Sequence, residues 1–268
     1  MRLAISNLAW PSVQDEQAFD RLAGLGVQGV EVAPTRLAAW DEIGDAMLSR
    51  YRARVEAAGL VVSSLQAVLF GRPELQLLGD GAAYGGMVEH MRQVGGIGSA
   101  LGAGVLVFGS PRNRLRGDMD PDRAWAIARD RFRHLGEITI ASGVIIGIEP
   151  VPPIYGGDFL TSWADVVRMV RDVDHPGVRV HLDTGCVSLN GDAIEDAIEA
   201  ARDLLCHFHA AQPQLGDFQD PLANHQDAAA ALRAAGYDRW LSIEMREQAN
   251  DPLAATEHAI RTVRSIYL

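Results

Sequence analysis

The 268-residue chain contains no lysine, because all 24 of its basic residues are arginines. Schiff-base catalysis, attachment of pyridoxal phosphate and the phosphate loop of P-loop nucleotide hydrolases each require a lysine. The sequence therefore excludes these three kinds of chemistry.

Cysteine, long apolar runs and clustered positive charge are also scarce. Cys186 and Cys206 are too few for a disulfide framework, so we expect a reducing cytoplasm. No apolar run approaches the roughly 20 residues of a membrane helix, and the N-terminal MRLAISNLAWPS lacks the apolar core of a signal peptide. We therefore expect no membrane partner and interpret this segment as a first strand. With a net charge of −11 and no basic cluster, we expect no nucleic-acid partner either.

Apolar strand patterns and amphipathic helix patterns alternate along the whole chain. The patterns predict strands at 2–7, 27–33, 60–70, 104–109 and 144–149, and three further strands ending at 183, 209 and 244. Helices are predicted at 15–26, 40–58, 81–101, 120–141, 162–173, 192–203, 224–235 and 252–266. Eight units of about 33 residues predict a single α/β domain over residues 1–268, a closed (β/α)8 TIM barrel. An open doubly wound sheet would need a glycine-rich turn after its first strand, and NLAWPS is not one.

Four of the predicted strands end in side chains that can bind a metal. They are Glu149 in VIIGIEPVPP, Asp183 in VRVHLDTG, His209 in LLCHFHAAQ and Glu244 in WLSIEM. Barrel enzymes have their active sites at the carboxyl ends of the strands, so we expect these residues to converge. Each carboxylate alone could be solvated or salt-bridged, but three carboxylates and an imidazole together favour one divalent metal ion. Hard-to-borderline divalent metals suit such a set, and Zn²⁺ is possible.

The segments IEP, HLDTG, HFHAAQ and SIEM resemble those of the xylose-isomerase-like TIM barrels, as do GSP at 109–111 and DFLTS at 158–162. This superfamily includes sugar and sugar-phosphate isomerases and epimerases and the related apurinic endonucleases. In its ketose 3-epimerases, the residues matching Glu149, Asp183, His209 and Glu244 bind one Mn²⁺, Mg²⁺ or Co²⁺. The two matching glutamates there exchange a proton on either face of the sugar. Relatives commonly have a histidine where this chain has Cys186, and the loop AAQPQLGDF has no match to their sugar-holding arginines.

We therefore expect a metal-dependent sugar or sugar-phosphate isomerase or epimerase. Its reaction would be proton transfer next to a carbonyl, through a metal-stabilised ene-diolate, with Glu149 and Glu244 as acid and base. A metal-dependent dehydratase or hydrolase of a small polyol in the same pocket is the closest alternative, and a non-catalytic polyol-binding barrel is another. Eight histidines and the net charge of −11 disfavour an apurinic endonuclease.

Further residues are candidates for contact with a small sugar or polyol substrate. These are Arg246, Cys186, Gln66, Trp10, Phe70 and His207. Most have an alternative: an ion pair with Glu247 or Asp217 for Arg246, a soft metal ligand for Cys186, a deeper position beneath the metal ligands for His207, and apolar packing for Trp10 and Phe70. Arg112, Arg114 and Arg116 could form a phosphate clamp, although a solvated loop is favoured. A homodimer is possible.

Overall fold

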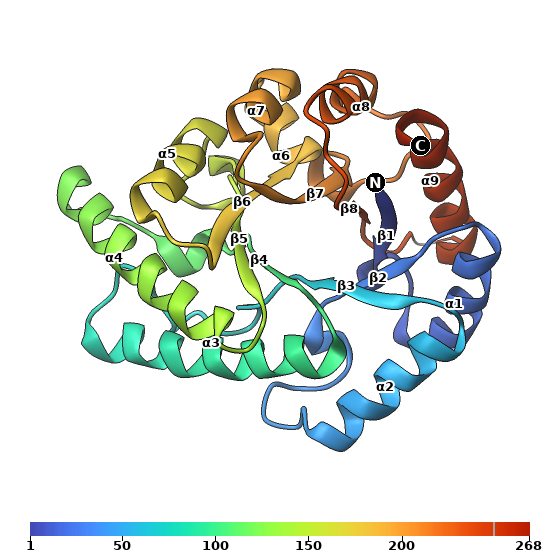
Figure 1. The fold of residues 1–268 in the computed structure, drawn as a ribbon, viewed down its shortest axis with the longest axis horizontal. Coiled ribbons are helices and arrows are strands. Elements are labelled where there is room, and N and C mark those ends of the chain that lie inside the picture. The colour runs from blue at the N-terminus through green and yellow to red at the C-terminus, as the bar shows by residue number, and fades with distance from the viewer. Residues whose placement is uncertain (249) are drawn as a thin grey trace.

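Eight parallel strands close into a barrel in the order in which they occur along the chain, with β8 paired to β1 (Figure 1). The computed structural model describes residues 1–248 and 250–268. The strands are β1 (Arg2–Ser6), β2 (Gly29–Val32), β3 (Val61–Leu65), β4 (Val105–Phe108), β5 (Ile145–Ile148), β6 (Val178–Asp183), β7 (Leu205–Ala211) and β8 (Trp240–Glu244). The predicted TIM barrel is confirmed.

A ring of helices surrounds the barrel in Figure 1, as crossover connections between parallel strands require. They are α1 (Asp15–Gly24), α2 (Asp45–Ala57), α3 (Gly81–Leu101), α4 (Pro121–Ile140), α5 (Trp163–Val173), α6 (Thr184–Leu189), α7 (Ile194–Ala201), α8 (His225–Ala234) and α9 (Pro252–Tyr267). The described residues thus form nine α-helices where eight helices were predicted. The additional one is the short helix α6, which follows β6 directly and precedes α7.

Apolar side chains on both faces of the strands form the core. Phe108 at the end of β4 meets Phe132 of α4 edge to face, with ring centroids 5.2 Å apart, and both are fully buried. Helix α3 remains continuous despite the glycine pairs at 85–86 and 95–96. A Cβ atom at Gly98 would lie 3.0 Å from Val144 Cγ1, so this glycine lets the helix approach the barrel closely. Tertiary packing here outweighs weak helix propensity.

Five strands are shorter than the sequence pattern predicts, and β3 differs most. Strand β3 ends at Leu65 rather than at Phe70, and β1 ends at Ser6. Residues 66–73 instead form part of a loop at the carboxyl end of the barrel, where Trp40 Nε1 donates a hydrogen bond of 2.8 Å to the Phe70 carbonyl. This loop becomes one wall of the cavity described below.

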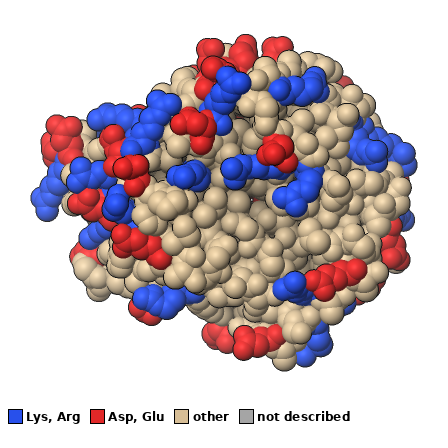
Figure 2. Space-filling view, viewed as in Figure 1, with Lys and Arg blue, Asp and Glu red and all other residues tan. Residues whose placement is uncertain are grey.

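Charged residues of both signs lie next to one another on the face shown in Figure 2. Among the residues that the structure describes, no helix combines the length and apolar character needed to cross a membrane.

Candidate metal centre and active site

The carboxyl ends of β5 to β8 bring together the four residues that the sequence singled out as metal ligands. Glu149 follows β5, Asp183 and Glu244 end β6 and β8, and His209 lies in β7 in register with Asp183. One ligand atom from each residue lies within 4.8 Å of those of the other three. Parallel strands explain this convergence, because their carboxyl ends all lie at one end of the barrel.

The donor atoms fit a divalent cation. His209 Nδ1 lies 3.2 Å from Glu244 Oε2 and 3.6 Å from Asp183 Oδ2. Among the described residues, neither His209 Nδ1 nor Asp183 Oδ2 has a hydrogen-bond partner, although both are buried. Buried polar atoms normally have a partner, and a cation at their meeting point would supply one. Three carboxylates and one imidazole suit Mn²⁺, Mg²⁺, Co²⁺ or Zn²⁺.

The crowded carboxylates perturb one another. Burial raises the pKa of Glu149 well above its ordinary value, and the negative charges of Asp183 and Glu244 raise it further. Burial also raises the pKa of Glu244, while the neighbouring His209 opposes that rise. A bound cation would reverse this situation by favouring the ionised carboxylates. Without a bound cation, the negative charge of these ionised carboxylates is therefore not fully compensated.

The sequence DTG fixes Asp183 at the end of β6. Asp183 Oδ1 accepts a hydrogen bond of 2.6 Å from the Cys186 amide and caps α6, which leaves Oδ2 directed to the cluster. Thr184 Oγ1 donates to the Ala211 carbonyl at 2.7 Å. A Cβ atom at Gly185 would lie only 2.7 Å from the Gln212 carbonyl oxygen, so glycine permits this close approach to the end of β7.

On its other side, His209 contacts Glu31 of β2, which is completely buried. Glu31 Oε1 lies 2.8 Å from His209 Nε2, while Oε2 lies 2.7 Å from His207 Nε2 and accepts a bond of 2.6 Å from Ser64. Burial alone would raise the pKa of Glu31, but His209 and His207 lower it well below its ordinary value. An anionic Glu31 beside Nε2 favours the tautomer of neutral His209 with its proton there, which would leave the Nδ1 lone pair for a cation.

Three histidines inside the barrel form a second possible metal cluster, His181, His207 and His209. His207 Nε2 is already engaged by Glu31 and lies 3.2 Å from Ser64 Oγ. By contrast, Glu149 and Glu244 line an open cavity. A cation in the carboxylate-rich cluster would therefore lie where a substrate can reach it.

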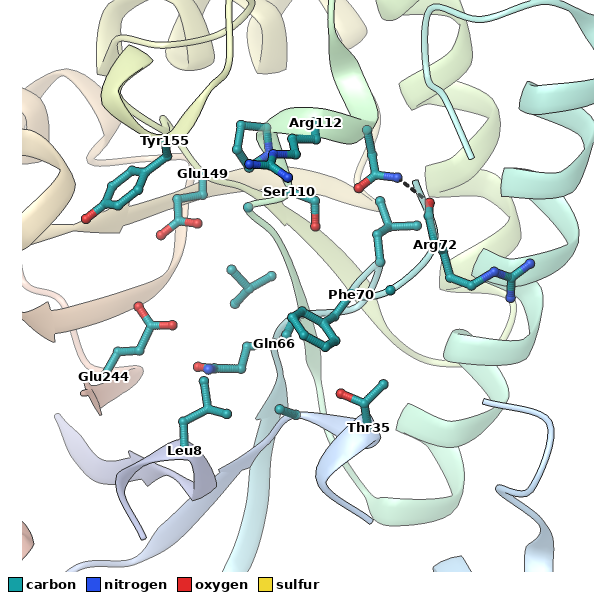
Figure 3. A pocket seen from close by; sticks show the side chains of 18 of the residues that line it. Leu8, Thr35, Gln66, Phe70, Arg72, Ser110, Arg112, Glu149, Tyr155 and Glu244 are labelled. Carbon is teal, nitrogen blue, oxygen red and sulfur yellow. Dashed lines mark hydrogen bonds between the residues drawn. The ribbon is translucent and has the colours of Figure 1, made fainter. Parts of the chain in front are cut away.

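A cavity of about 800 Å³ opens above the barrel, with Glu149 and Glu244 at one end of it. Figure 3 shows the two carboxylates pointing into the same space, Glu149 beside Tyr155 and Glu244 across from it. The Tyr155 hydroxyl accepts a hydrogen bond of 2.9 Å from the Gln214 amide and so links the loops after β5 and β7. The arrangement can hold a small polar molecule against two carboxylates.

The other substrate-contact candidates fall in different places. Gln66 and Phe70 line the cavity, and Phe70 is 66% exposed. Trp10 is fully buried and its indole donates to Asp15 at 3.0 Å, as the packing alternative described. Arg246 is exposed and is not part of the cavity lining.

Two further candidates lie next to the proposed metal ligands. The Cys186 thiol stays neutral, because burial and then the charge of Asp183 raise its pKa well above the usual value. His207 lies beneath His209 and contacts Glu31, in the deeper position that was its alternative.

The expectation of a solvated loop was wrong for Arg114, which is completely buried. Its guanidinium donates to the carbonyls of Phe108, Glu149 and Leu160 at 3.3, 2.7 and 3.3 Å. Burial lowers its pKa to about 10, so it remains charged at neutral pH. It joins the ends of β4 and β5 and thereby fixes the backbone of Glu149.

Sequence reasoning missed Glu31 and Tyr155. Glu31 interrupts the apolar run VQGVEVA, and a lone charge in a buried strand was the one available signal for it. Tyr155 lies in the proline-rich loop after Glu149, whose path no local pattern defines.

Comparison with known proteins places the chain in a family. The model of the xylose isomerase-like TIM barrel family matches residues 19–266, so the chain belongs to that family. The 3-dehydro-D-guloside 4-epimerase of Escherichia coli (strain K12) is 26% identical over 186 residues, which cover 67% of this chain and 68% of the relative. The predicted family is confirmed, and so is the expectation of an enzyme.

Solved structures share the same fold. The D-psicose 3-epimerase of Clostridium cellulolyticum H10, crystallised with D-tagatose, superposes with a TM-score of 0.84 at 17% identity and covers 100% of this chain and 99% of its own. The 3-keto-D-glucoside 4-epimerase of E. coli has a TM-score of 0.78 at 19% identity, with 99% of each chain covered. At these identities the likeness concerns the fold alone.

Gly109, at the end of β4, makes room for the carboxylate of Glu149. A Cβ atom there would lie 1.8 Å from Glu149 Oε2, so Gly109→Ala must displace this side chain. We expect Mn²⁺ affinity to fall by about tenfold or more, since ligand position controls metal binding. Gly104→Ala, where a Cβ meets nothing within 4 Å, is the control. Equal affinity of the two variants, measured by electron paramagnetic resonance titration, would contradict this geometry.

Glu31→Gln should weaken Mn²⁺ binding by about 10- to 100-fold, because it removes the charge that holds the His209 proton on Nε2. Competition with a fluorescent chelator measures the affinity, and circular dichroism verifies that the variant is folded. Glu42→Gln, an exposed change in the loop after β2, should leave the affinity unchanged. A folded Glu31→Gln protein with wild-type affinity would show that Glu31 does not position His209.

Proposed function

We propose that the protein is a divalent-metal-dependent sugar epimerase that moves a proton on a carbon next to a carbonyl group. The observation that carries the proposal is the position of Glu149 and Glu244 at one end of an open cavity. They lie beside His209 Nδ1 and Asp183 Oδ2, two buried atoms without hydrogen-bond partners among the described residues. The family match and the epimerase from E. coli support the same reaction class.

Glu149, Asp183, His209 and Glu244 would hold the cation. When bound, Mn²⁺, Mg²⁺ or Co²⁺ would polarise the carbonyl of the substrate and offset the negative charge that develops beside it. Asp183 and His209 would hold the cation without touching the substrate, because neither of them is part of the cavity lining. Glu149 and Glu244 both line it and can also reach the substrate.

The two glutamates are the acid and base. One carboxylate removes the carbon-bound proton, and the other delivers a proton to the opposite face of the same carbon, which inverts its configuration. Burial alone raises the pKa of both carboxyl groups, and a bound cation would oppose that rise. Delivery to the neighbouring carbon would instead give isomerisation, but the epimerase relative favours inversion.

A keto-sugar fits this chemistry, since it has an acidic proton between a carbonyl and a hydroxyl group. Gln66, Ser110 and Tyr155 provide polar groups along the cavity, and Phe70 provides an apolar surface for the sugar ring. The relative from E. coli acts on a 3-dehydro-D-guloside, and a structural neighbour was crystallised with D-tagatose. A small carbohydrate is therefore the proposed substrate.

Glu149→Gln and Glu244→Gln should each abolish exchange of the substrate carbon-bound proton with deuterated water, a loss of roughly 10²- to 10⁴-fold. NMR follows the exchange with Mn²⁺-loaded protein and a panel containing D-fructose, D-psicose, D-tagatose and 3-keto-D-glucosides. Glu247→Gln, exposed in the loop after β8, is the matched control and should exchange like wild type. Full exchange in either active-site variant would refute the two-base mechanism, and a product lighter by one water would indicate a dehydratase instead.

A further inference from the structure

The cavity extends well beyond the two glutamates. Most of its lining comes from the loops after β2, β3 and β4, on the far side from Asp183 and His209. Its volume of about 800 Å³ lies in the range of pockets that enclose drug-sized ligands, of roughly 300–1,000 Å³. A single hexose held between Glu149 and Glu244 would leave much of this space unfilled.

Two arginines from separate loops line the extended part of the cavity. Arg36 lies in the 3-10 helix after β2 (Pro34–Arg36), and Arg112 in the one after β4 (Pro111–Arg114). Strand β3 lies between β2 and β4, so the loops that carry the two arginines flank the loop of residues 66–73. Figure 3 shows the Arg112 guanidinium beside Ser110, on the same side of the cavity as Glu149.

Both guanidiniums have unused hydrogen-bonding capacity. Arg36 donates to the Trp10 carbonyl, but its buried Nε has no partner among the residues that the structure describes. Within the same residues, the Arg112 side chain forms no ion pair or hydrogen bond. Arg72, the third arginine of the lining, differs from both because it is paired with Glu74 and contacts His90. Its guanidinium points away from the glutamates in Figure 3.

Negative charge is absent from this part of the cavity. Of the described residues that line it, only Glu149 and Glu244 are acidic, although the chain as a whole carries a net charge of −11. Neither Arg36 nor Arg112 forms an ion pair with a carboxylate among the described residues, so each guanidinium can still bind an anion through charge-assisted hydrogen bonds.

We propose that the substrate carries a negatively charged group, a carboxylate or a phosphate, at the end remote from the reacting carbon, and that Arg36 and Arg112 bind it. This assignment rests on the proposed function, since it places the reacting end of the sugar between Glu149 and Glu244. Charge-assisted bonds from guanidiniums are strong and directional, so the pair would select anionic sugars over neutral ones and fix how far the sugar enters.

Calorimetric binding to the Mn²⁺-loaded protein tests the proposal without requiring turnover. The probes are two pairs that differ in charge, D-fructose 6-phosphate with D-fructose and D-glucuronate with D-glucose, and they separate phosphate from carboxylate recognition. We expect at least one anionic probe to bind about tenfold or more tightly than its neutral partner. Arg112→Gln and Arg36→Gln should each reduce that preference by about tenfold.

Arg123→Gln, an exposed change of equal charge on α4, is the control and should preserve the preference. Because Arg112 is exposed, its replacement leaves the core intact even if Arg36→Gln affects folding. Equal affinity for the charged and neutral members of both pairs would overturn the proposal, as would a preference that persists in Arg112→Gln. Anion binding without proton exchange on any sugar would contradict the proposed function while supporting this subsite.

Discussion

Mutual repulsion among buried carboxylates is the interaction on which the architecture of the site depends. Glu149, Asp183 and Glu244 lie around one point, largely removed from water, where the charges of Asp183 and Glu244 make Glu149 more difficult to ionise. Such an arrangement is stable only if bound protons or a cation compensate the negative charge. Much of the surrounding structure is explained by the need to hold these groups in place until a cation balances them.

The supports lie both beneath the site and beside it. Glu31 contacts two histidines in the barrel interior, a region that apolar side chains usually fill. A buried anion there is unfavourable for stability alone, and its benefit is the orientation of His209. Beside the site, the buried Arg114 ties the strand end of Glu149 to neighbouring carbonyls, and the missing side chain of Gly109 leaves space for its carboxylate. Glu31, Arg114 and Gly109 are therefore explained better by the positions of the proposed ligands than by the packing of the core.

The sequence was sufficient to predict the barrel and the convergence of its four proposed ligands. Repeated strand and helix patterns define the topology, and parallel strands direct Glu149 and Glu244 to the same end although 95 residues separate them in the numbering. Long-range partners were not predictable. The carboxylate of Glu31 meets a histidine 176 residues away, and the burial of Arg114 depends on three carbonyls that only the folded loops bring together. Phe70 was placed on a strand because its segment is apolar, but the chain turns at Gln66 and carries it to the cavity.

The central claim, that these four side chains share one cation, is tested most directly by titrating the metal-free protein with Mn²⁺ in a calorimeter. The titration is repeated at several pH values and in buffers of different ionisation enthalpy. Because the pKa values of Glu149 and Glu244 are raised, both carboxyl groups bind protons more tightly than usual, and the cation must displace those protons. The account predicts one ion per chain, release of protons on binding, and affinity that rises with pH. Absence of binding, or pH-independent binding without proton release, would contradict it.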